Sequence, residues 1–135
     1  MKNLLVLSLT LFVLTTPGCA SSKYNLPALA GMNISDLESA KDKGLAKTFN
    51  MPLNTAFDET LNILKAEQLT VFRSSKKKGY IIAMGFKEQV DTTRVGIFFE
   101  TISADKTKIT ISCLSLTALP KAEKIVFGGL SKASL

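Results

Sequence analysis

Residues 55–86, TAFDETLNILKAEQLTVFRSSKKKGYIIAMGF, give the clearest indication of the fold, because the spacing of their apolar residues changes partway along the stretch. In the first half, apolar residues recur every three or four positions, at Ala56, Phe57, Leu61, Ile63 and Leu64. This spacing predicts a helix over 55–68 with one apolar face, which packs on a sheet. Asn54 or Thr55 is the expected cap at its start, because short polar side chains accept hydrogen bonds from the first free N–H groups.

The second half of the stretch changes from the helical period to a period of two at Leu69. Alternation of this kind predicts two strands, LTVFRSS and YIIAMGF. The segment between them, residues 75–79, reads as a hairpin loop in which Gly79 is available for a positive φ. A loop this short makes the two strands antiparallel neighbours.

The flanking sequence extends this sheet on both sides. Upstream, residues 45–51 alternate and end at Pro52, which predicts a short edge strand. Downstream, TTRVGIFFETIS and KITISCLSL predict two more strands, joined by a turn at residues 104–107. Pro120 then starts a second helix, with an apolar side formed by Ala122, Ile125, Val126, Gly129 and Leu130.

The predicted element order is therefore β-α-β-β-β-β-α. Short hairpin loops imply an antiparallel sheet, and both helices can cover the same face of it. The sequence predicts an α+β fold, a two-layer sandwich of an antiparallel sheet with two helices on one face.

Composition narrows the chemistry that this chain can perform. It has 135 residues, a mass of 14.6 kDa and a net charge of +6, with no histidine and only two cysteines. The length suits one domain. Without histidine the chain cannot build a Ser-His-Asp triad, a His-activated cysteine or a His-ligated metal site, and two cysteines cannot complete a structural zinc site. We expect neither a metal nor a cofactor.

The first twenty residues form a targeting segment. Lys2 supplies positive charge, and an apolar run follows over residues 4–14. About 11 residues are too few for a membrane span, which needs about 20, so the run is a signal-peptide core. Pro17 and Gly18 end it and expose an extended stretch to a signal peptidase.

The end of this segment resembles the lipobox of bacterial lipoprotein precursors. Gly18 and Cys19 match that pattern, whereas Thr16 replaces the usual Leu and Pro17 is uncommon. The resemblance implies cleavage before Cys19 and lipidation of Cys19, and several acyl chains hold a protein stably on a membrane. Ala20 after the cysteine implies, by resemblance to enterobacterial sorting, the outer membrane facing the periplasm. The alternative is cleavage after Ala20, which leaves a soluble secreted protein.

These assignments divide the chain into three parts. The signal peptide covers residues 1–18, a lipidated N-terminus with a flexible tether covers 19–43, and a single α+β domain covers 44–135. Within the tether, Ser35-x-x-Glu38 resembles a capping box, so a short helical turn over residues 35–41 is the alternative to a fully extended segment. Once Cys19 is lipidated, Cys113 is alone, so we expect no disulfide within the chain. The alternation around Cys113 predicts a small buried hydrophobe.

Nothing in the domain has the pattern of a catalytic site. The carboxylates are scattered, and although Glu88 and Asp91 share a loop, no signal places them in a cleft. The sequence contains no G-x-S-x-G elbow and no phosphate-binding glycine loop. We therefore expect a non-enzymatic protein.

Two surfaces are candidates for binding. Arg73, Lys76, Lys77 and Lys78 form the densest basic cluster, which suits anionic lipid headgroups or a polyanionic envelope polymer. The alternative is a solvated hairpin tip that prevents association. Phe98, which the alternation places on the outward face, and the edge strand are a second candidate surface, for a protein partner. Nucleic acid is not an expected partner, because no aromatic residues interleave with the basic ones.

The whole chain is similar to small bacterial lipoproteins that carry an α+β domain behind a short tether. The matching features are the Cys19 lipobox, the AFDETLNILKAEQL helix, the strands around KKKGYIIAMGF and the final apolar helix. The resemblance extends loosely to accessory lipoproteins of outer-membrane assembly machines, which implies binding to another envelope protein in an assembly or accessory role. The alternative function is a small-ligand or lipid-binding periplasmic domain with a cavity between helices and sheet.

Overall fold

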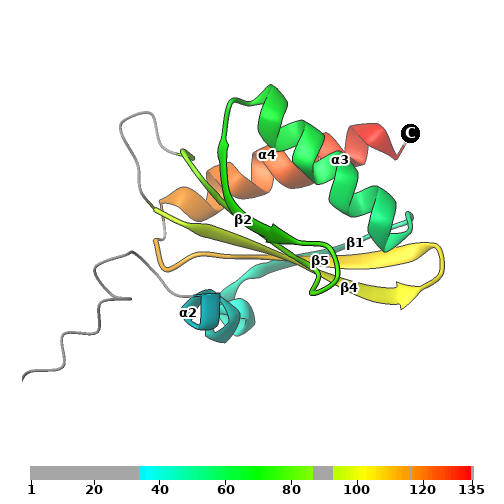
Figure 1. Ribbon diagram of the computed structural model, residues 1–135, viewed down its shortest axis with the longest axis horizontal. Coiled ribbons are helices and arrows are strands. Elements are labelled where there is room, and N and C mark those ends of the chain that lie inside the picture. Colours follow the sequence, from blue (N-terminus) through cyan, green and yellow to red (C-terminus); the bar gives the residue numbers. More distant parts are fainter. Residues whose placement is uncertain (1–33, 87–92, 116, 135) are drawn as a thin grey trace, which may run out of the picture.

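The computed structural model describes residues 34–86, 93–115 and 117–134. The elements along these residues, labelled as in Figure 1, are α2 (Ile34–Ser39), the short 3-10 helix η1 (Lys41–Lys43), β1 (Leu45–Phe49), α3 (Leu53–Ala66), β2 (Thr70–Ser75), β3 (Tyr80–Met84), β4 (Val95–Ser103), β5 (Lys106–Ser112) and α4 (Ala118–Ala133).

The described strands form one five-stranded sheet in the order β1-β5-β4-β3-β2, and every neighbouring pair is antiparallel. Strands β2 to β5 follow each other as hairpins, and β1 joins at the far side by pairing with β5, with Leu45 opposite Ile111. The predicted α+β fold with an antiparallel sheet is confirmed. The two outer strands are β1, as predicted, and β2.

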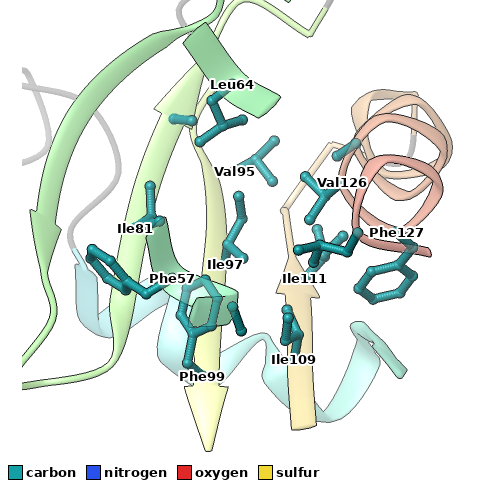
Figure 2. Close-up of a cluster of buried hydrophobic side chains, with 14 of the residues drawn as sticks. Phe57, Leu64, Ile81, Val95, Ile97, Phe99, Ile109, Ile111, Val126 and Phe127 are labelled. Atoms are coloured by element: carbon teal, nitrogen blue, oxygen red, sulfur yellow. The ribbon is translucent and has the colours of Figure 1, made fainter. Parts of the chain in front are cut away.

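Helices α3 and α4 lie on the same face of this sheet (Figure 1). The space between these two helices and the sheet is filled by apolar side chains from the helices and the strands (Figure 2). Ile97, Leu64 and Val126 are fully buried there. Two tilted ring pairs join helix to sheet: Phe57 to Phe99 at 5.3 Å between ring centres and Phe49 to Phe127 at 5.6 Å. The two-layer sandwich is thus built by the alternation and helical stripes seen in the sequence.

Two glycines have structural roles that the sequence partly indicates. Gly79 has a φ of 65°, as predicted for the hairpin loop. Gly129 lets α3 and α4 approach closely, because a Cβ there would meet Ile63 Cδ1 at 2.7 Å. The neighbouring Gly128 faces open space, where a Cβ would meet nothing within 4 Å. The pair neither ends nor breaks α4, which continues to Ala133.

Helix starts differ from the prediction. α3 begins at Leu53 with Pro52 at its N-cap, and neither Asn54 nor Thr55 caps it. The fixed φ of Pro52 suits a chain turning into a helix, and no side chain caps the first N–H groups. α4 begins at Ala118, which puts Pro120 in the first turn, where its missing N–H has no intrahelical partner to lose.

Residues 34–43 lie in the stretch that we predicted to be a tether, with a short helical turn at 35–41 as the alternative, and the structure shows helices there. They form α2 and η1, which lie on the face of the sheet opposite to α3 and α4 (Figure 1). Leu37 is completely buried there, against Tyr80, Ile82 and Phe98. The Ser112 hydroxyl donates a hydrogen bond to the Leu37 carbonyl at 2.6 Å, which joins α2 to β5.

Phe98 is consequently not an outward-facing surface residue. Its side chain is 5% exposed, because α2 covers it, and Lys41 Nζ lies 4.2 Å from its ring centre. The strand pattern placed Phe98 correctly on the face away from α3 and α4. The pattern did not predict that a helix covers Phe98, because the two apolar residues of α2, Ile34 and Leu37, are too few to give a clear helical period.

Candidate functional site

Several predicted site residues lie outside the described residues. Gly18 and Cys19, the cleavage and lipidation residues, belong to 1–33, and Glu88 and Asp91 belong to 87–92. The lipid anchor therefore stays a prediction.

The predicted basic cluster is divided by the fold. Lys76, Lys77 and Lys78 occupy the β2–β3 hairpin tip, but Lys76 Nζ lies 2.6 Å from Asp58 Oδ1 of α3. Because both partners are largely exposed, this ion pair contributes at most about 1 kcal/mol, and its main effect is to hold the tip beside α3. Lys77, Lys78 and Arg73 are exposed, which fits either the anionic-surface hypothesis or the solvated tip.

The outer strand β2 presents the largest apolar exposure near a sheet edge. Val71 is 38% and Phe72 50% exposed. Phe72 is in a bulge, because Val71 pairs with Ala83 while Arg73 pairs with the next residue, Ile82. The guanidinium carbon of Arg94 lies 3.7 Å from the Phe72 ring centre.

We call Val71, Phe72, Arg73 and Arg94 the β2 edge surface. The aromatic residue predicted to be exposed, Phe98, is covered by α2, whereas Phe72 of the outer strand β2 is half exposed. One feature of the sequence indicates that β2 is exposed: TVFRSS has few apolar residues, as suits a strand with little buried surface.

A second surface, which the sequence did not predict, lies between the two long helices. It is a groove of about 880 Å³ lined by residues of α3, of α4 and of the turn after α3; we call it the α3–α4 groove. Its lining includes the apolar residues Ile63, Ala66 and Ile125 with both glycines, and the charged residues Glu67, Lys121, Lys124 and Lys132. This groove is on the outside of the helical layer, whereas the predicted alternative cavity would lie between helices and sheet, where buried side chains fill the space (Figure 2).

The charged side chains of the described residues lie on the surface, whereas the Tyr80 ring is buried in the cluster beneath α2. In the described part of the chain no Asp, Glu, Lys or Arg is buried, and the buried polar residues are Thr60, Thr107 and Ser112. Each of these three hydroxyls donates to a backbone carbonyl, so all three serve the fold. Cys113 is half-buried, and its Sγ accepts a hydrogen bond from the Ser115 N–H at 3.2 Å.

One carboxyl has a perturbed titration. Ser103 Oγ donates a 2.7 Å hydrogen bond to Asp105 Oδ1 in the β4–β5 turn, which lowers the pKa of Asp105 from its ordinary value of 3.8. The carboxyl group of Asp105 is fully exposed, and its hydrogen bond is internal to the turn.

Within the described ranges, no group of three or more Cys, Asp or Glu residues is placed so that it could hold a metal ion.

No helix of residues 34–86, 93–115 and 117–134 is both long enough and apolar enough to span a lipid bilayer. Comparison of the sequence with protein-family models found no match, and comparison with curated proteins found none either.

Proposed function

We propose that the protein is a non-enzymatic lipoprotein, anchored through Cys19 to the outer membrane facing the periplasm, whose domain binds another envelope protein. The anchor rests on the lipobox-like Gly18–Cys19 pair after an apolar run of signal-peptide length. The Asp, Glu, Lys and Arg side chains of the described residues are all at least partly exposed and so are available for contact with a partner, which supports a binding role.

The observation that carries the binding role is the β2 edge surface. Phe72 is half exposed, and Arg94 stacks on it, so an aromatic ring and a guanidinium stand together at a sheet edge. Aromatic residues and arginine are enriched in interface cores and among the residues that dominate binding energy. An outer strand also offers backbone N–H and C=O groups to an extended segment of a partner.

The intact mass of the mature protein extracted from membranes tests the anchor. We expect the mass of residues 19–135 plus acyl chains, and loss of both lipid and membrane association in Cys19→Ala. A mass equal to residues 21–135 without lipid would instead identify a freely diffusing secreted protein.

Site-specific photocrosslinking in cells tests the binding surface. A photoreactive residue at position 72 is expected to give one defined protein adduct, and Arg94→Ala should reduce its yield. The matched control is position 102, because Ile102 is 54% exposed but lies in β4 near the β4–β5 turn. No adduct from position 72, or the same adducts from both positions, would contradict the proposal.

A further inference from the structure

The α3–α4 groove combines an apolar floor with a basic rim. Ile63 and Ile125 are half-buried, and Gly128 leaves room above the α4 backbone because a Cβ there would have no neighbour within 4 Å. The close approach of the helices at Gly129 and Ile63 closes the bottom of the groove. Its volume of about 880 Å³ is within the range of binding sites, roughly 300–1,000 Å³.

The charges along the groove are unbalanced. Three lysines and one glutamate line it, and all four side chains are exposed. Neither of the two ion pairs found among the described residues involves Lys121, Lys124 or Lys132. The rim therefore has an excess of two positive charges, since one glutamate offsets one of its three lysines.

The positions of the lysines give the groove a direction. Lys124, Gly128 and Lys132 follow i, i+4, i+8 spacing, so they form one row along α4, with the open glycine between two cations. The row is about 12 Å long, since a helix rises about 1.5 Å per residue. A second helix with an apolar residue over Gly128 and acidic residues about two turns apart would match both its shape and its charge.

We propose that the α3–α4 groove binds an acidic amphipathic helix of a partner protein. The helix places its apolar stripe on Ile63, Ile125 and Gly128, and its carboxylates pair with Lys124 and Lys132. The two helices that form the groove lie on the face of the sheet opposite to α2 (Figure 1). This surface is separate from the β2 edge surface and does not depend on it.

Peptide titration tests this proposal on the chain lacking residues 1–18. The probe is a synthetic 18-residue peptide with a leucine stripe flanked by glutamates eight positions apart, and binding is followed by amide chemical shifts. We expect saturable shifts concentrated at Ile63 and at residues 124–132. The double substitution Lys124→Glu, Lys132→Glu should weaken binding at least about tenfold, since two attractive pairs become repulsive. Gly128→Leu should weaken it at least about fivefold, by filling the groove.

Matched controls separate a specific groove from general charge attraction. Lys77→Glu with Lys78→Glu makes the same change in net charge at the hairpin tip, outside the groove, and should leave the affinity unchanged within about twofold. Circular dichroism verifies that each variant is folded. Absence of peptide binding, equal weakening by the hairpin control, or displacement of the peptide by phosphatidylglycerol vesicles would each overturn the proposal, the last by identifying a membrane as the occupant.

Discussion

The two faces of the sheet are covered in different ways. On one face, α3 and α4, of 14 and 16 residues, enclose a large apolar core. On the other, the six-residue α2 covers a cluster of four buried residues, Leu37, Tyr80, Ile82 and Phe98. Both faces contain completely buried side chains, so burial alone does not distinguish them. The two faces differ in what packs around a buried residue: two long helices on one face and one short helix on the other.

This difference implies two levels of cooperativity. Removing a residue from the large core disturbs helices and strands together, so it should act on global unfolding. Removing a buried side chain from the α2 face loosens only a short helix. A hydrogen bond from the Ser112 hydroxyl to the Leu37 carbonyl helps to hold this helix on the sheet. Short elements with few buried contacts open locally, at a lower free energy than the whole domain.

Leu64→Ala tests the large core and should have the largest effect. Leu64 is completely buried in α3, and its truncation leaves a cavity that the surrounding core cannot fill. We expect the free energy of unfolding to fall by about 3–5 kcal/mol, measured by urea denaturation. A loss below about 1 kcal/mol would contradict the close packing of this face.

Leu37→Ala is the matched change on the other face, with the same residue type and the same complete burial. The global loss should be smaller, about 2 kcal/mol, because α2 can detach and let the cavity collapse. Hydrogen exchange should show protection lost in residues 34–43, with the β4 and β5 amides, which pair within the sheet, still protected. Equal global destabilisation by Leu37→Ala and Leu64→Ala would mean that α2 belongs to the same cooperative unit.

The two adjacent glycines of α4 differ in the space around them, so the same substitution should have opposite effects at the two positions. Gly129→Ala should lower the free energy of unfolding by about 1 kcal/mol, because the new Cβ must push aside the stiff, β-branched Ile63. The cost of moving Ile63 exceeds the gain in helix propensity from alanine. Gly128→Ala should instead stabilise the domain by about 0.5–1 kcal/mol, since its Cβ enters open space and alanine favours the helix. Thermal unfolding of both variants checks the opposite signs; a shared sign would show that space around the two positions is not what separates them.

The smallest effect should come from the β4–β5 turn, which belongs to neither covered face. Because the pKa of Asp105 is lowered in the folded protein, its hydrogen bond stabilises the turn above the ordinary carboxyl pKa. That contribution is lost as the pH falls through the lowered value. Ser103→Ala should raise the pKa of Asp105 toward 3.8, as measured by an NMR titration of the carboxyl carbon. An unchanged titration curve would refute the role of the Ser103 hydroxyl.

Much of the architecture was predictable because its signals are local. The change from helical to alternating spacing at Leu69 identified α3 and the β2–β3 hairpin, and the loop glycine at position 79 has the expected positive φ. The candidate surfaces were less predictable. Lys76 was expected in an exposed basic cluster and pairs with Asp58, and Phe98 was expected to be exposed and is covered. Both outcomes depend on residues distant in sequence, which period and propensity do not report.

Local sequence patterns predicted the five strands, the two long helices, the order of these seven elements and the core-facing side of each strand, because hydrophobic periodicity can be read residue by residue along the chain. Only the tertiary structure decided that β2 is the second sheet edge, that α2 covers Phe98 and that α3 and α4 leave a lysine-rimmed groove. Strand order and helix docking come from contacts between segments far apart in sequence, and these contacts follow from the summed burial of many side chains, which no short stretch contains.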